Sequence, residues 1–180
     1  MRIWRLSKVG AVVLALFAVS IVATVAQVDP DAGPPVYVTG LIGCEKIEPG
    51  TRGTSEAIVR RAVDGMRDQV LECQFEMDDP RVSGTAMNRF NDDVVATTPS
   101  TAITWGTMTL QGPEGAWECS YIGETERVNQ GLCRGSDGYD RMVFLFRTAT
   151  EEDQPADDGM GLVGLIYEGD APPFLELPTE

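Results

Sequence analysis

The sequence contains no histidine, so it lacks the commonest general base and the commonest metal ligand of proteins. Hydrolases that depend on a Ser-His-Asp or Cys-His arrangement are therefore excluded, as are zinc sites with histidine ligands. A Gly-rich phosphate loop, a nucleophile elbow and the acidic spacing of an EF-hand are also absent. Any acid–base chemistry would have to use Asp, Glu, Tyr, Lys or Arg, and the sequence predicts no cofactor.

Basic residues are scarce: 14 Lys and Arg stand against 28 Asp and Glu, which gives a net charge of −14. Nucleic acids and anionic membrane surfaces attract proteins through Lys and Arg, so we expect neither as a partner. The acidic excess serves solubility or, alternatively, provides a cation-binding surface. A chain of 180 residues with 43% hydrophobic residues predicts one domain with a self-supporting core.

Residues 1–26 have the composition of a signal peptide. Arg2, Arg5 and Lys8 precede an apolar run from Val9 to Val25, and small residues allow cleavage after Ala26. An uncleaved anchor is the alternative, because the run is just long enough to span a bilayer. Both interpretations place the rest of the chain outside the cytoplasm, secreted or anchored. Cleavage would change the net charge from −14 to −17 and leave a polar linker at 27–35.

The four cysteines predict two disulfides, since an even number in an exported domain usually pairs. Of the three possible connectivities we favour Cys44–Cys73 and Cys119–Cys133, the two pairs that are local in sequence. Each would contribute about 3–4 kcal/mol through the entropy of the unfolded chain. A metal site made of all four thiolates is the alternative, although no C-x-x-C pair supports it.

The chain from Pro80 to Thr150 alternates apolar with polar residues between turn residues, a pattern typical of antiparallel strands with one buried face. Similar segments flank it, and no long crossover separates them. The sequence therefore predicts an all-β, eight-stranded antiparallel up-and-down barrel over residues 36–172, followed by a tail at 173–180; an open sandwich is the alternative. The expected strands are Val36–Cys44, 56–63, Gln69–Met77, Arg81–Phe90, Ile103–Leu110, Gly115–Gly123, Tyr139–Thr148 and Gly161–Glu168.

Residues 56–77 are ambiguous, because EAIVRRAVDGMRD fits an amphipathic helix as well as a hairpin turning at Asp64-Gly65. Gly65 would weaken a helix centre and favours the hairpin. A strand at 56–63 would separate the strands of Cys44 and Cys73 by about 9–10 Å, farther than the ~7 Å that a disulfide spans. Either Cys44 lies in a loop or this segment is not fully inserted. The acidic pairs Asp78-Asp79 and Asp92-Asp93 are expected to form turns.

Five short motifs consist mainly of turn and packing residues: MDDPRVSG (77–84), WGT (105–107), GAWE (115–118), GY (138–139) and IYEGD (166–170). Together they resemble exported bacterial proteins of the allene oxide cyclase/dirigent-type barrel superfamily. The resemblance covers roughly residues 36–172 and implies an eight-stranded barrel, often with an apolar cavity and often oligomeric. Characterised branches steer cyclisation or coupling of reactive small molecules, and some bacterial relatives catalyse cycloadditions. No catalytic motif of those branches matches, and Arg141 stands where the resemblance leads us to expect Gly.

Candidate ligand-binding residues are Trp105, Trp117, Tyr121, Tyr139 and Arg141, on strands that would line or cover one cavity. Aromatic side chains inside a small barrel often form core, so packing is the alternative for each. Trp117 and Tyr121 share a phase with Cys119, which points Glu118 to solvent. Arg141 shares the phase of Tyr139 and is expected to face inward or to lie at the rim with its guanidinium in water.

A run of acids between residues 150 and 158 predicts a solvated loop, with calcium binding as the alternative. The acids are Glu151, Glu152, Asp153, Asp157 and Asp158.

Three functional hypotheses follow. The first is an exported acidic barrel without catalytic machinery that binds a small apolar ligand or a protein partner. The second is a cyclase or isomerase that works by positioning a reactive substrate, which needs little proton transfer. The third is a surface or adhesion module whose interior is filled. A cavity above about 300 Å³ would favour the first two, and the resemblance adds a possible homo-oligomer.

Overall fold

A computed structural model of the chain describes residues 33–55, 62–96, 101–124, 129–148 and 160–170. The predicted signal peptide, most of the ambiguous segment 56–63, the acidic loop with its calcium alternative, and the tail lie outside the described residues.

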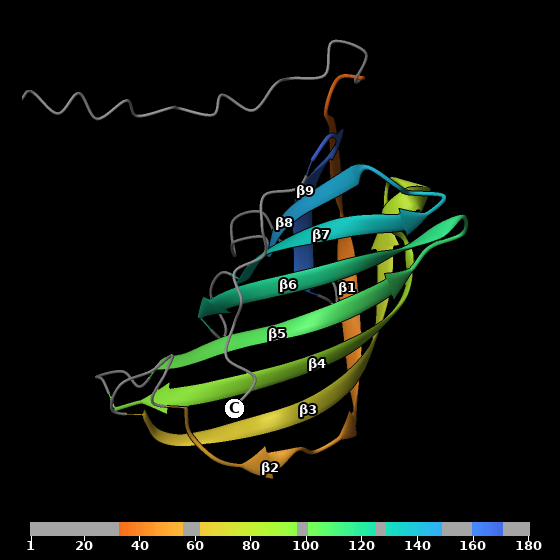
Figure 1. Cartoon of the computed structure of the whole chain (residues 1–180). Helices are drawn as coiled ribbons and strands as arrows, with labels where there is room; N and C mark the ends of the chain where they lie inside the picture. The colour runs from red at the N-terminus through yellow and green to blue at the C-terminus, as the bar shows by residue number, and fades with distance from the viewer. Residues whose placement is uncertain (1–32, 56–61, 97–100, 125–128, 149–159, 171–180) are drawn as a thin grey trace, which may run out of the picture.

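The described chain forms nine antiparallel strands in one sheet, and the sheet closes on itself (Figure 1). Neighbours follow the order β1-β9-β8-β7-β6-β5-β4-β3, and β1 also pairs with β3, which completes a ring of up-and-down strands. The predicted barrel is confirmed and the open sandwich is wrong. The strands are β1 (Val36–Glu48), β2 (Thr51–Arg52), β3 (Ala62–Met77), β4 (Gly84–Val95), β5 (Thr101–Gln111), β6 (Gly115–Glu124), β7 (Asn129–Asp137), β8 (Met142–Thr148) and β9 (Met160–Glu168).

The expected number of strands in the ring is right, but three local assignments are wrong. The expected turn at Asp64-Gly65 lies inside β3, which runs without a hairpin or helix from residue 62. Most of the separate strand expected at 56–63 lies outside the described residues, so that prediction stays open. Strand β7 lies where the sequence predicts no strand, between the expected strands Gly115–Gly123 and Tyr139–Thr148. The expected turn at Asn91–Asp93 is also wrong, because β4 continues to Val95.

Both predicted disulfides are present, and each joins residues directly opposite one another on neighbouring strands. Cys44–Cys73 links β1 to β3, with Cα atoms 4.0 Å apart, and we call it the cavity disulfide. Cys119–Cys133 links β6 to β7, with Cα atoms 3.9 Å apart, and we call it the floor disulfide. The expected difficulty with the first pair disappears because β1 and β3 are direct neighbours. No free cysteine remains, so a four-thiolate metal site is excluded.

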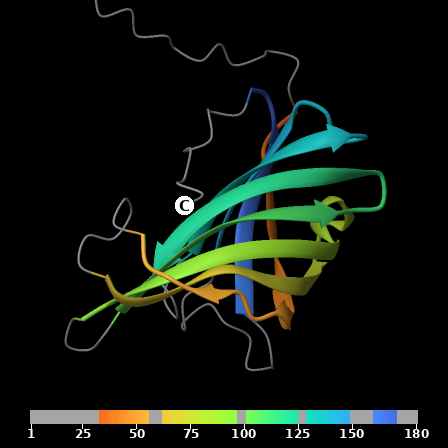
Figure 2. The ribbon, with the colours of Figure 1, turned by 60° about the horizontal axis from the view of Figure 1, so that its bottom comes forward.

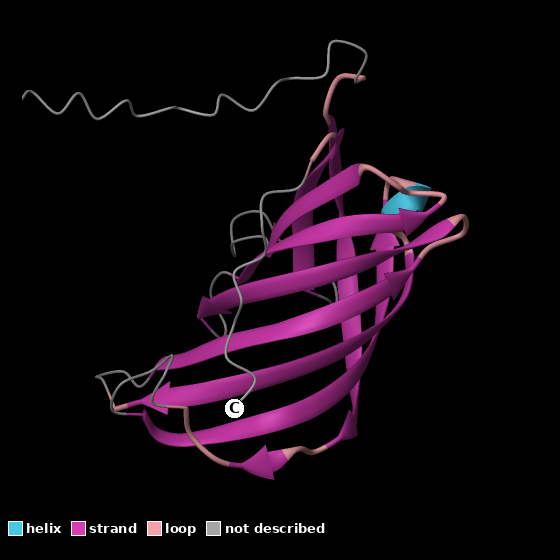
Figure 3. Ribbon diagram, in the orientation of Figure 1, coloured by secondary structure: helices cyan, strands magenta, loops and turns pink. Residues whose placement is uncertain are grey.

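One end of the barrel is closed by tight turns and a single 3-10 helix, η1 (Pro80–Val82), drawn in cyan in Figure 3. Asp79 caps η1 by accepting a hydrogen bond from the backbone N–H of Arg81, and its carboxylate also pairs with the Arg81 guanidinium. Asp78 accepts hydrogen bonds from the backbone N–H and the hydroxyl of Thr39 on β1. The predicted turn role of Asp78-Asp79 is therefore confirmed.

At the other end of the barrel, consecutive strands are joined by the segments 56–61, 97–100, 125–128 and 149–159, which lie outside the description (Figure 2). Here β1 extends beyond β9: Ile42 is the last β1 residue paired with β9, whereas pairing with β3 continues to Glu48. Among the described residues, β1 at this end pairs with β3 and no longer with β9, and we call this break between β1 and β9 the seam.

The interior is shaped by glycines that face aromatic rings across strand pairs. Tyr121 lies opposite Gly106 on one side and Gly131 on the other, and Trp117 lies opposite Gly135. A methyl group on Gly106 would come within 2.7 Å of the Tyr121 hydroxyl, so large rings on one strand occupy the space that small residues leave on the next.

Candidate functional site

A cavity of about 430 Å³ lies inside the barrel toward its seam end. Its described lining comes from every strand of the ring and is mostly apolar, so its volume and character fit a small-molecule site. A filled, inert interior does not fit this observation. The lining residues are Ile42, Cys44, Lys46, Gln69, Leu71, Phe75, Asn88, Phe90, Asp92, Thr104, Met108, Tyr121, Asn129, Phe146, Thr148, Met160 and Leu162.

The floor of the cavity is the packed core of the closed end. Trp117 stacks on Tyr139 with ring centroids 5.1 Å apart and meets Phe144 edge-on at 6.0 Å. Trp117 Nε1 donates to the carbonyl oxygen of Arg81 at 2.7 Å, and the Tyr139 hydroxyl accepts from the backbone N–H of Glu114. The polar atoms of Trp117 and Tyr139 thus bind the backbone of turns, and the two rings pack in the closed end of the barrel without lining the cavity.

A polar pair interrupts the apolar wall inside the cavity. The Tyr121 hydroxyl on β6 donates to Asn88 Oδ1 on β4 at 2.9 Å, across the intervening strand β5. Burial raises the pKa of the Tyr121 phenol well above its ordinary value, because the ionised form would lose its hydration. Tyr121 is therefore protonated at neutral pH, and it can donate or accept a hydrogen bond but cannot act as a base.

A second polar group lies at the seam end and links β1, β3 and β4. The Lys46 ammonium donates to Gln69 Oε1 at 2.6 Å, and Gln69 Nε2 donates to Asp92 Oδ2 at 2.7 Å. Gln69 is 3% exposed and thus holds one cation and one anion at fixed positions beside the cavity. The site offers both signs of charge to the polar end of a ligand.

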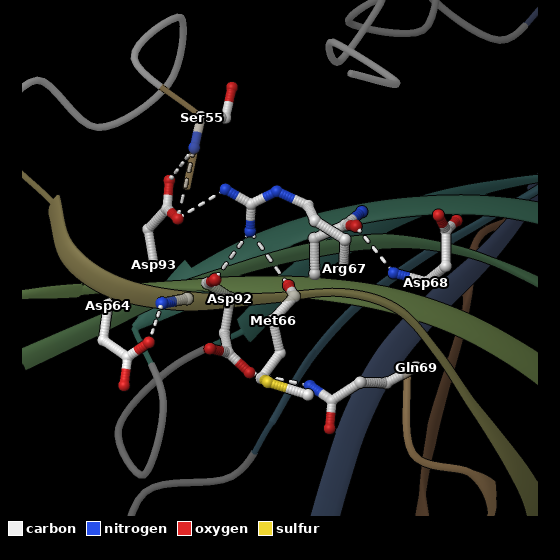
Figure 4. Close-up of polar contacts among 10 residues, drawn as sticks. Ser55, Asp64, Met66, Arg67, Asp68, Gln69, Asp92 and Asp93 are labelled. Carbon is white, nitrogen blue, oxygen red and sulfur yellow. Dashed lines mark hydrogen bonds and ion pairs between the residues drawn. The ribbon is translucent and has the colours of Figure 1, made fainter. Parts of the chain in front are cut away.

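The opposite side of β3 and β4 carries what we call the outer latch. It consists of Ser55, Arg67 and Asp93 (Figure 4), together with Trp105 of β5, which packs against Arg67. The Arg67 guanidinium pairs with the Asp93 carboxylate and donates to the carbonyl oxygens of Met66 and Asp92. Asp93 is fully buried and also accepts from the backbone N–H of Ser55. The latch ties the residues after β2 to the sheet and fixes the backbone from which Asp92 reaches the cavity.

Trp105 belongs to this latch and not to the cavity. Its ring is 2% exposed, and the Arg67 guanidinium carbon lies 4.9 Å from the ring centroid. Strand alternation explains the placement, since Thr104 lines the cavity and its neighbour must point outward. Trp105 Nε1 is buried and makes no hydrogen bond within the described part of the chain.

Arg141 also lies away from the cavity: of its two expected positions the inward one is wrong, whereas an exposed side chain agrees with a guanidinium in water. It is exposed in the turn before β8, outside the strand whose phase it was expected to share. Its φ of 64° lies in the left-handed region that favours glycine, the residue the resemblance implied there. Of the five predicted ligand-binding residues, only Tyr121 lines the cavity, and Glu118 is exposed as expected.

Sequence reasoning missed the polar cavity residues Lys46, Gln69, Asn88, Asp92 and Asn129. A signal was present for two of them: Asn88 and Asp92 share the phase of Ala86 and Phe90 and are thus inward-facing polar residues. Asn129 Oδ1 is buried beside the cavity without a hydrogen bond among the described residues. These residues, and not the large aromatic ones, give the interior its chemistry.

A shallow groove of about 510 Å³ lies on the outer face of β1, β9 and β8. Tyr37, Leu165 and Leu145 lie directly opposite one another across these strands, and Tyr37 is 83% exposed. The described residues that line the groove include no carboxylate, in contrast to the acidic chain as a whole.

Comparison of the chain with family models, curated proteins and solved structures gave no match. Within the described residues no helix is long and apolar enough to cross a membrane. Nor do these residues bring together three or more His, Cys, Asp or Glu side chains that could hold a metal ion.

Proposed function

We propose that the protein is an exported barrel that binds a small, largely apolar molecule in its interior cavity. The observation that carries the proposal is the 430 Å³ cavity, whose size falls within the range of small-molecule sites and whose wall is mostly apolar. Export is supported by two disulfides in a domain of this size and by the signal-like N-terminus.

Titration with the fluorescent lipophile N-phenyl-1-naphthylamine tests this function. We expect saturable binding of one probe per chain with enhanced fluorescence. Leu71→Trp places a large ring in the cavity, because Leu71 lines it opposite Asn88, and should abolish binding. Gln74→Trp on the same strand is the matched control, since its side chain is exposed outside the barrel. Equal binding by both variants would show that the probe binds elsewhere.

A cyclase or isomerase is the second candidate, favoured by the polar groups that converge on the cavity. Tyr121 and Asn88 could orient a reactive oxygen while the apolar wall folds the rest of the molecule into a productive shape. Turnover of a bound lipophile by the wild type, with loss in Asn88→Leu, would support this candidate over simple binding.

Self-association through the outer groove is a further candidate, supported by charge. In a chain of net charge −14, two copies approach with least repulsion through a face without carboxylates. Light scattering with Tyr37→Ser tests it, and Met87→Ser, which removes an exposed apolar residue of β4 outside the groove, is the control.

A further inference from the structure

The Tyr121–Asn88 pair has more hydrogen-bond donors than it uses. The asparagine amide carries two N–H groups and the phenol one O–H, and the pair makes a single internal bond. Two donors therefore remain whichever partner gives the proton. Among the described residues the Asn88 side chain makes no other hydrogen bond, and it is only 8% exposed.

The described residues beside the pair in the strand register supply no side-chain acceptor. Asn88 lies between Leu71 and Met108 in the strand register, and both line the cavity with apolar side chains. Tyr121 is flanked by Gly106 and Gly131, which leave its ring and hydroxyl in place without offering a side chain. An amide in such a wall is costly unless its donors find an acceptor inside the cavity.

The Tyr121 bond also fixes the direction of the amide. Because the phenol donates to Oδ1, the amide nitrogen is the end left for another partner. Such a partner needs a lone pair, as a carbonyl or ether oxygen has, and it must sit on a skeleton that fits an apolar wall.

We propose that the cavity selects lipophilic molecules that carry an acceptor oxygen, such as a ketone or ester, and that the Asn88 amide binds this oxygen. The inference rests on the proposed function and adds the chemical class of the ligand. It also separates the roles of two neighbours: Tyr121 positions the amide, and Asn88 makes the contact.

Two probes that differ by one carbonyl group test the proposal. Butyrophenone and butylbenzene share a phenyl ring and a four-carbon chain, and each is measured by displacement of N-phenyl-1-naphthylamine from the full chain. The double variant Asn88→Leu/Tyr121→Phe removes the pair without stranding a buried polar partner. We expect the variant to bind butyrophenone roughly 3–10-fold more weakly, the loss of one hydrogen bond, and butylbenzene as tightly as the wild type does.

The outcomes separate this proposal from the function on which it rests. If butylbenzene binds and the variant changes both affinities equally, the carbonyl is not recognised at Asn88 and the proposal is overturned while the binding function stands. If neither probe binds the wild type, the function itself fails.

Infrared spectroscopy gives a test that needs no variant. The carbonyl stretch of butyrophenone bound to the wild type should lie below its position in hexane, because a hydrogen bond weakens the C=O bond. A stretch at the hexane position would overturn the proposal.

Discussion

Breaking the ion pair of the outer latch should destabilise the protein strongly. Asp93 is fully buried and the Arg67 side chain is 13% exposed. The ion pair is therefore a buried one, whose disruption costs far more than that of a pair at the surface. Arg67→Met keeps an aliphatic chain over the Trp105 ring but leaves the Asp93 carboxylate with the N–H of Ser55 as its remaining partner among the described residues. An uncompensated buried charge costs about 3–5 kcal/mol, a large part of a typical total stability.

Urea unfolding followed by tryptophan fluorescence measures this cost. The double variant Arg67→Met/Asp93→Leu removes both charges, so it should recover most of the loss, since a buried pair contributes little compared with apolar residues of similar size. Arg52→Met is the control: its pair with Asp64 has side chains 80% and 53% exposed, and we expect a change below about 1 kcal/mol. A loss in Arg67→Met no larger than that of the control would refute the account of the latch.

The remaining predictions concern the closed end, the interior glycines and the disulfides. The hydrogen bond from Arg81 lowers the pKa of Asp79 in the folded protein. The ionised carboxylate therefore stabilises the fold fully above the ordinary pKa of aspartate, ~3.9, and this stabilisation is lost as the pH falls through the lowered pKa of the folded state. Asp79→Asn should therefore flatten the decline in melting temperature between about pH 4 and pH 2, and an unchanged decline would count against the pair. Gly131→Ala places a methyl group against the ring of Phe146 and should lower the free energy of unfolding, measured with urea, by about 1–3 kcal/mol. Gly43→Ala places its methyl group in open space, so the free energy of unfolding should hardly change. A mild reductant should open the cavity disulfide, which has one exposed cysteine, well before the buried floor disulfide. Mass spectrometry of alkylated peptides follows the order of reduction, and the opposite order would contradict the prediction.

The barrel could be predicted from the sequence because most strands carry apolar residues at every second position. Strand β7 was missed for a physical reason: its inward positions are Gly131, Cys133 and Gly135, so the strand shows no apolar alternation. Rings from the neighbouring strands fill that part of the interior, among them Tyr121 and Trp117. Packing between strands can thus erase the local pattern by which a strand is recognised.

The misassigned turn at Asp64-Gly65 has a similar origin. The pattern Asp64-Gly65 predicts a turn, but Gly65 lies within β3, where a methyl group would come within 2.5 Å of the carbonyl oxygen of Gly53 and of Asp93 Oδ1. The glycine is needed because the chain after β2 crosses closely over this strand. Sequence reveals that a position must be small, but not whether the cause is a turn or a close contact from elsewhere.

The candidate site was the least predictable part, because its polar residues come from many strands and their convergence depends on register. Asn88 and Tyr121 are 33 residues apart and meet across β5. The large aromatic residues are poor guides to the site, because Trp117 and Tyr139 pack in the closed end and Trp105 packs on the outer face.

Native mass spectrometry of protein recovered after export tests the central claim most directly, because it shows whether the interior holds a molecule. We expect a population of chains one ligand mass heavier than the oxidised polypeptide, with the added mass released by organic solvent and missing from Leu71→Trp. Only the bare polypeptide mass in the wild type, under conditions that preserve a known lipophile complex, would contradict the claim that this barrel binds a small molecule.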